Sequence, residues 1–139
     1  MKKFIQTVNT IEAPVDAVWA QIRTGENVDT WLPIITSCRV EGNKRYCTTE
    51  DGALDETILK SDDQEKVFQY AIGEQNLFPV TGIKGTMRLR EVDEQTTNLF
   101  WDLEFDLQDE NLFGDIKEGI EGLYTAGALG LGQLANQAA

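Results

Sequence analysis

Hydrophobic and polar residues alternate along most of this chain, which is the two-residue period of strands that bury one face of a sheet. The first such run covers residues 3–11, and six more follow residue 33. Short segments rich in Gly, Asn and Asp separate these runs, and connections of that length join antiparallel neighbours. The pattern therefore predicts one strand and then a six-stranded antiparallel meander. The six later strands are expected at residues 34–41, 44–50, 53–61, 65–74, 82–92 and 96–107.

Two short helical segments interrupt the alternation after the first strand. A helix is predicted to begin at Pro14, which suits a first helical position, and to end near Arg23, before Gly25. A further helical turn is predicted across residues 27–31. No repeat or linker divides residues 1–139, so we expect a single domain. The order of elements predicts an α+β fold with helices on one face of an antiparallel sheet.

The last predicted element, residues 109–139, is a long amphipathic helix. At about 100° per residue its apolar side chains fall within an arc of roughly 80°. It contains six glycines, and each costs about 1 kcal/mol relative to alanine in a helix, so we expect tertiary packing to compensate. Gly127 and Gly130 lie on the apolar side, where we expect them to leave room beneath the helix. The stripe consists of Phe113, Ile116, Ile120, Leu123, Gly127, Leu131 and Leu134.

The turns predict which residues oppose one another on neighbouring strands, because opposed residue numbers in a hairpin have a constant sum. We place these turns at residues 42–43, 51–52 and 62–64. The N–H and C=O of Cys47 point to the same side, so Cys47 can form a hydrogen-bonded pair with its partner on only one of the two flanking strands. Two tight two-residue turns would give it such a pair with neither, so one loop must hold four residues or the strand must bulge. The face of each residue is therefore better determined than its partner. The predicted row is Cys38, Cys47, Glu56 and Tyr70, with Arg45 opposite Val40 and Ile58.

One face of the predicted sheet is apolar and is expected to lie under the helices. Its polar exceptions are Arg45, Glu56 and Tyr70, which must either satisfy one another or orient a ligand in a pocket. The sequence leaves both alternatives open. The opposite face carries charges that we interpret as a solvated surface. The apolar positions are Ile34, Leu54, Ile58, Phe68, Ile72, Met87, Leu89, Leu99, Trp101, Leu103 and Phe105, and the charged ones are Arg88, Arg90, Asp102, Glu104 and Asp106.

The composition argues against several classes of partner. Twelve basic and 24 acidic residues give a net charge of −12, which repels nucleic acids and anionic membranes. The chain has no histidine, and its two cysteines lie nine positions apart, so we expect no metal site and no cofactor. The start lacks an apolar signal region and the glycine-rich end does not suit a membrane span, so we expect a cytoplasmic protein without membrane insertion. In a reducing cytoplasm Cys38 and Cys47 are more often buried thiols than a disulfide, although their opposition leaves a bridge open.

Several segments, taken in their order, resemble the START-like superfamily (helix-grip, SRPBCC), and within it the polyketide cyclase/dehydrase branch. The resemblance implies a seven-stranded antiparallel sheet curved around the C-terminal helix, with a hydrophobic cavity between them. It also implies a cavity mouth near residues 76–82, with Phe78 where the family has a leucine. The chain departs from aromatic cyclases of this type because it lacks their usual set of polar cavity residues. The matching segments are residues 11–19, 31–33, 38–42, 54–58, 70–72, 78–80 and 97–101.

Three functions are compatible with this sequence. The first is binding, without catalysis, of a small hydrophobic or aromatic molecule such as a lipid or polyketide. The second is a cyclase or dehydratase in which Glu56, whose pKa burial would raise and Arg45 would lower, acts as general base and Tyr70 or Arg45 polarises a carbonyl. The third is a chaperone-activator-like interaction module that uses the acidic outer face. The sequence leaves the ligand unidentified and a homodimer open.

For the first function we expect a defined set of residues to contact the ligand. It combines the inner face of the sheet with the entrance loop and the start of the long helix. These residues are Arg45, Cys47, Glu56, Ile58, Phe68, Tyr70, Phe78, Met87, Leu89, Trp101, Leu103, Phe113, Ile116 and Ile120.

Overall fold

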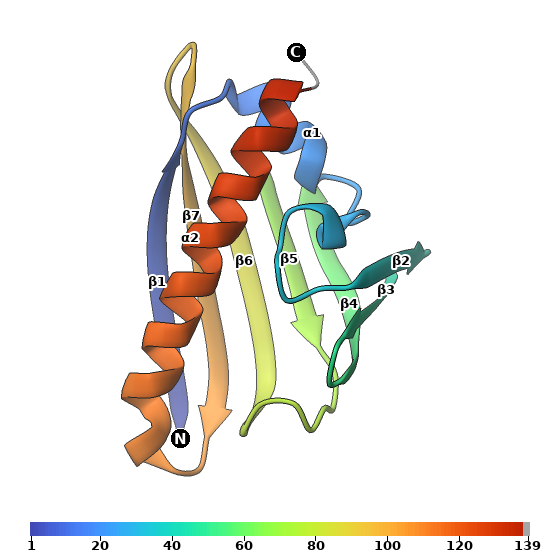
Figure 1. The fold of residues 1–139 in the computed structure, drawn as a ribbon, viewed down its shortest axis with the longest axis vertical. Coiled ribbons are helices and arrows are strands. Elements are labelled where there is room, and N and C mark those ends of the chain that lie inside the picture. Colours follow the sequence, from blue (N-terminus) through green and yellow to red (C-terminus); the bar gives the residue numbers. More distant parts are fainter. Residues whose placement is uncertain (138–139) are drawn as a thin grey trace.

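The computed structural model describes residues 1–137 and shows a seven-stranded antiparallel sheet curved around one long helix (Figure 1). The strand order is β1-β7-β6-β5-β4-β3-β2, so the first strand joins the far edge of the meander. This confirms the predicted helix-grip architecture. The strands are β1 (Lys2–Ile11), β2 (Ser37–Glu41), β3 (Lys44–Thr49), β4 (Gly52–Asp62), β5 (Val67–Ile72), β6 (Val80–Asp93) and β7 (Thr96–Leu107).

The helices lie together on the concave face of the sheet. The short helix α1 (Val15–Ile22) packs beside the C-terminal half of α2 (Phe113–Gln137), which crosses the sheet diagonally (Figure 1). The 3-10 turns η1 (Val28–Thr30) and η2 (Glu110–Leu112) precede β2 and α2 respectively. The long helix therefore begins four residues later than the predicted Asp109, whose side chain instead accepts a hydrogen bond from the Asn111 N–H. The predicted end of the helix at Ala139 lies outside the described residues.

The predicted apolar face of the sheet is the buried one. Trp101, Phe105 and Leu99 are almost fully buried, as is Phe68 on β5. The opposite face is mixed in charge, because Lys2 pairs with Glu104 at 3.3 Å and Lys84 lies opposite the same residue. Alternation alone therefore identified the core side of β2 to β7 correctly.

The register between β3 and β4 differs from the prediction. The turn is formed by residues 50–51 instead of 51–52, because the Thr49 hydroxyl accepts hydrogen bonds from the N–H groups of Asp51 and Gly52. Each β3 residue consequently lies opposite a β4 residue two positions earlier than predicted. Cys47 faces Leu54 instead of Glu56, and Arg45 faces Glu56 instead of Ile58. A shift of two positions keeps every side chain on its face of the sheet.

The register between β4 and β5 also differs, because residues 63–66 connect the two strands instead of residues 62–64. An irregularity in β4 between Ile58 and Lys60 then shifts the pairing by one residue. Ile58 lies opposite Tyr70, and Glu56 lies opposite Ile72. The predicted opposition of Glu56 and Tyr70 is therefore wrong, whereas the opposition of Cys38 and Cys47 is confirmed.

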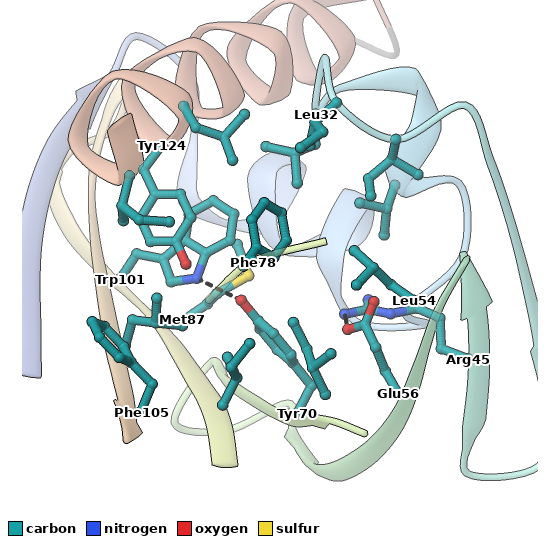
Figure 2. Close-up of a pocket in the computed structure, with 18 of the residues that line it drawn as sticks. Leu32, Arg45, Leu54, Glu56, Tyr70, Phe78, Met87, Trp101, Phe105 and Tyr124 are labelled. Atoms are coloured by element: carbon teal, nitrogen blue, oxygen red, sulfur yellow. Dashed lines mark hydrogen bonds and ion pairs between the residues drawn. The ribbon is translucent and has the colours of Figure 1, made fainter. Parts of the chain in front are cut away.

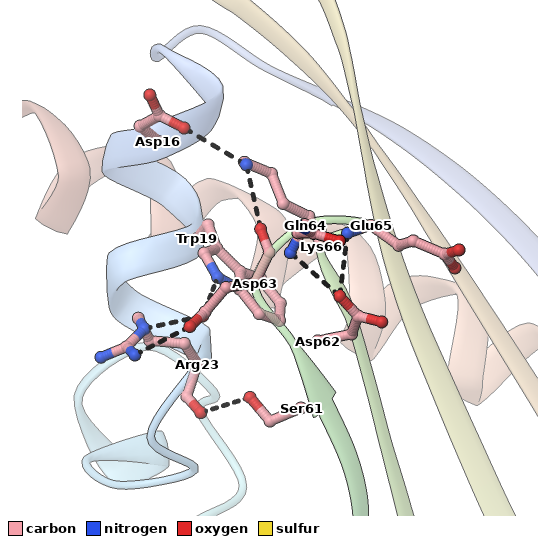
Figure 3. Close-up of polar contacts among 9 residues, drawn as sticks. All are labelled: Asp16, Trp19, Arg23, Ser61, Asp62, Asp63, Gln64, Glu65 and Lys66. Carbon is pink, nitrogen blue, oxygen red and sulfur yellow. Dashed lines mark hydrogen bonds and ion pairs between the residues drawn. The ribbon is translucent and has the colours of Figure 1, made fainter.

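The turn between β4 and β5 is tied to α1 through its acidic residues. The Asp63 carboxylate accepts hydrogen bonds from Trp19 Nε1 at 2.9 Å and from Arg23 at 3.0 and 3.1 Å (Figure 3). Lys66 lies 3.4 Å from Asp16, at the start of the same helix. These contacts hold α1 against one end of the sheet.

Two glycines of α2 allow the segment around η1 to approach the helix closely, and they do not leave an empty space beneath it. A Cβ at Gly130 would lie 2.5 Å from the carbonyl oxygen of Trp31, and one at Gly127 would lie 3.0 Å from Leu32. The segment around η1 fills the room that we expected beneath these glycines. The expected compensation for helix glycines is thus the packing of this segment, and the cavity lies further toward the start of α2.

Candidate ligand cavity

A partly open cavity of about 460 Å³ lies between α2, the sheet and the segment that follows α1 (Figure 2). Nearly all of its wall consists of apolar side chains. From α2 the wall includes Ile116, Ile120 and Leu123, about two to four helical turns before Gly130. The loop between β5 and β6 contributes Phe78, in agreement with the expected position of the mouth.

The structure places ten of the fourteen residues expected to contact a ligand on this wall. They come from five strands, from the loop between β5 and β6, and from α2. The ten are Arg45, Glu56, Phe68, Tyr70, Phe78, Met87, Trp101, Leu103, Ile116 and Ile120.

The other four expected residues lie away from the wall, each for a structural reason. Cys47 packs against Cys38, because the β3–β4 register brings Arg45 and not Cys47 beside Glu56. Ile58 is covered by the loop after α1. Leu89 lies opposite Leu99, two positions beyond the Met87–Trp101 pair. Phe113 lies at the start of α2, where Lys3 Nζ is 5.2 Å from its ring centroid.

Arg45 and Glu56 form a buried ion pair at the inner side of the cavity. The distance from Arg45 Nη2 to Glu56 Oε1 is 2.7 Å, and each residue is only 6% exposed. Burial opposes the charged guanidinium, but Glu56 more than offsets this, so the pKa of Arg45 lies above its ordinary value. The guanidinium also lies 5.1 Å from the Tyr70 ring centroid. Each of the two charges is therefore neutralised by the other.

Gly25 fixes the loop that covers this ion pair. Its carbonyl oxygen accepts hydrogen bonds from Arg45 Nη1 at 3.2 Å and from Cys38 Sγ at 3.7 Å. Its φ of +75° favours glycine, and a Cβ there would lie 2.8 Å from Ile58 Cδ1. The loop can therefore lie this close to the sheet only with glycine at this position.

Tyr70, Trp101 and Tyr124 form a second polar cluster in the cavity (Figure 2). Trp101 Nε1 donates a hydrogen bond of 3.0 Å to the Tyr70 hydroxyl, and the Trp101 ring stacks on Tyr124 with centroids 3.7 Å apart. Burial raises the pKa of both tyrosines, so both phenols are neutral near pH 7. Gly85 lies opposite Tyr70, and a Cβ there would overlap the phenol ring.

Sequence reasoning missed Tyr124, Trp31 and Leu32, all of which line the cavity. Tyr124 lies only about 20° from Phe113 on the helical wheel, just outside the apolar stripe. A wider stripe would have included it. Trp31 and Leu32 were noticed only as part of a family motif, since their contact with α2 depends on the long-range approach at Gly127 and Gly130.

Two buried donors in the cavity wall have no hydrogen-bond partner within residues 1–137. They are Trp31 Nε1 and Arg45 Nε, and both residues are 6% exposed. Buried donors are nearly always satisfied in folded proteins, by protein, water or ligand. Each of the two donor atoms is also shielded by its neighbours, so it does not lie on the surface of the cavity itself.

The two cysteines are free thiols with their sulfur atoms 3.5 Å apart. The pKa of Cys38 is lowered to about 7, chiefly because the Cys47 thiol donates a hydrogen bond to it and also because the Val28 backbone and Arg45 favour the thiolate. The same hydrogen bond and burial raise the pKa of Cys47. Cys38 is thus the more acidic thiol of the pair.

The helices of residues 1–137 include none that is both long and apolar enough to cross a membrane. The predicted cytoplasmic location stays a prediction.

Comparison with known proteins agrees with the fold and with the resemblance found in the sequence. A family model described as polyketide cyclase / dehydrase and lipid transport matches residues 2–136. No curated protein matches the sequence significantly.

Several solved structures share this fold. An uncharacterised protein of Bacillus thuringiensis matches with a TM-score of 0.83 and 23% identity, over 96% of this chain and 99% of its own. The protein XoxI of Bacillus cereus matches with a TM-score of 0.82 and 24% identity, over 97% of this chain and 96% of its own. A protein of Nitrosospira multiformis matches with a TM-score of 0.74 and 20% identity, over 91% of this chain and 94% of its own. At these identities the likeness concerns the fold alone.

Proposed function

The chain belongs to the polyketide cyclase / dehydrase and lipid transport family, and from this premise we propose that it binds a small hydrophobic or aromatic molecule without transforming it. The observation that carries the proposal is the apolar cavity of about 460 Å³. Pockets of roughly 300–1,000 Å³ with an apolar lining and few polar groups are typical of small-molecule sites. The ten wall residues predicted from the sequence are the proposed ligand contacts.

The pairing of the carboxylate on the inner face of the sheet favours binding over catalysis. Glu56, which the cyclase or dehydratase alternative requires as general base, is already paired with Arg45 at 2.7 Å. The pKa of Tyr70 is raised by burial, so its phenol is not a base near neutral pH. The third alternative requires an acidic outer face, and that face is mixed in charge around Glu104.

The proposal can be tested with a tryptophan placed inside the cavity. N-phenylnaphthylamine is an uncharged dye whose fluorescence rises in apolar surroundings, and we expect the purified protein to bind it. Leu123 lines the cavity from α2, so Leu123→Trp should fill part of it and weaken dye binding by at least about tenfold.

Leu129→Trp provides a matched control on the same helix. Leu129 is 66% exposed, so the same substitution there adds the same indole without entering the cavity. We expect Leu129→Trp to bind the dye as the parent protein does, with circular dichroism confirming that both variants fold. Failure of the parent protein to bind the dye, or equal binding by the two variants, would contradict the proposed function.

A further inference from the structure

We propose that the cavity selects uncharged, flat ring molecules and that it rejects the ionised relatives of the same molecules. This inference deepens the proposed function and rests on it. It follows from the charges and the aromatic surfaces of the cavity wall.

The charges of the wall disfavour an anionic ligand. Its charged residues are Arg45, Glu56, Glu26 and Asp115, which are one cation and three anions. The one cation is already neutralised by Glu56 at 2.7 Å and hydrogen-bonded to the Gly25 carbonyl. A buried carboxylate, sulfonate or phosphate needs a counterion, and among the described wall residues none is free to supply it.

The aromatic residues of the wall favour a flat ligand. Trp101 is stacked on Tyr124, and the Trp31 ring lies tilted to Trp101 with centroids 5.9 Å apart. Phe68 and Tyr70 are tilted to each other with centroids 6.4 Å apart. Ring systems gain from offset stacking and edge contacts with such surfaces, beyond the burial of their area.

Two probes with one ring skeleton test the selection against charge. Fluorenone is uncharged, and fluorenone carboxylic acid carries a charge at neutral pH. We expect the carboxylate to bind at least about tenfold more weakly than fluorenone. Affinities can be measured by quenching of tryptophan fluorescence or by displacement of N-phenylnaphthylamine.

Glu56→Gln tests the role of the ion pair. Glutamine keeps an oxygen for Arg45 but removes the charge that neutralises it, so the guanidinium becomes available to an anion. We expect the carboxylate probe to gain about tenfold relative to fluorenone in this variant. Glu94→Gln makes the same change in net charge in the exposed turn between β6 and β7 and should leave the preference unaltered.

Equal binding of fluorenone and its carboxylate by the parent protein would overturn the selection against charge. If the protein binds N-phenylnaphthylamine but shows that equality, the proposed function stands and this inference fails. Binding of neither the dye nor either of the two probes would overturn both.

Discussion

At the scale of single residues, Gly85 determines whether Tyr70 can lie where it does. The two residues are opposed on β5 and β6, and a Cβ at position 85 would overlap the phenol ring. Gly85→Ala should therefore displace Tyr70, break its hydrogen bond from Trp101 and destabilise the protein by about 1–3 kcal/mol. Urea denaturation measures this loss, and dye binding should weaken with it.

The cause can be checked in a second background. If the overlap with the ring is responsible, Gly85→Ala should cost much less in a Tyr70→Ala protein, because the two changes share one contact. An unchanged cost in that background would show that the effect comes from the backbone at position 85 and not from Tyr70.

The polar residues of the inner face show which features the sequence could predict and which it could not. Alternation placed Arg45, Glu56 and Tyr70 on the inner face, and the structure agrees. It could not predict that Arg45 and Glu56 are direct partners, because the turn uses residues 50–51 and a threonine hydroxyl at position 49 selects it. Either neighbouring dipeptide could have formed that turn, and only the side-chain hydrogen bonds distinguish them.

At the scale of elements, Asp63 connects the β4–β5 turn to α1. Hydrogen bonds from Arg23, then from Trp19, lower the pKa of Asp63 from 3.8 to about 2. A lowered carboxylate pKa contributes stability above the unfolded value, and this contribution is lost as pH falls toward the folded value. The stability difference between the parent protein and Asp63→Asn should thus be constant above about pH 4 and shrink between pH 3.8 and about 2.

Denaturation at a series of pH values measures this difference. Glu94→Gln, which removes an exposed carboxylate far from α1, is the control for the change in net charge. A difference that stays constant down to pH 2 would contradict the pairing of Asp63 with Arg23 and Trp19.

The packing of α2 explains its glycines, whose individual contacts the sequence analysis could not predict. Gly130 lets the helix approach the Trp31 backbone, whereas a Cβ at Gly122 would meet no atom within 4 Å. Gly130→Ala should destabilise the protein by about 1–3 kcal/mol despite the better helix propensity of alanine. Gly122→Ala should stabilise it by up to about 1 kcal/mol. Thermal denaturation of the two variants compares them directly, and two changes of equal sign would contradict this assignment.

At the scale of the whole molecule, the fold was predictable and the extent of the cavity was not. Periodicity and turn spacing determined seven strands and a covering helix, since each depends on residues close together in the chain. The cavity depends on how near α2 comes to the segment around Trp31, which is a contact between residues about one hundred positions apart. Because of that contact, Leu32 lines the cavity and occupies the space beneath Gly127, and the cavity lies nearer the start of α2.

The cavity also links ligand binding to the stability of the whole fold. A ligand that binds only the folded protein stabilises it by about 1.4 kcal/mol at a free concentration tenfold above Kd. For a chain of 139 residues this corresponds to a rise in Tm of roughly 4 °C. We expect fluorenone to produce this rise in the parent protein and in Leu129→Trp, measured by differential scanning calorimetry at the same multiple of the parent Kd. Leu123→Trp should show a much smaller rise, because the space that the ligand occupies is already filled; an equal rise would place the ligand outside the cavity.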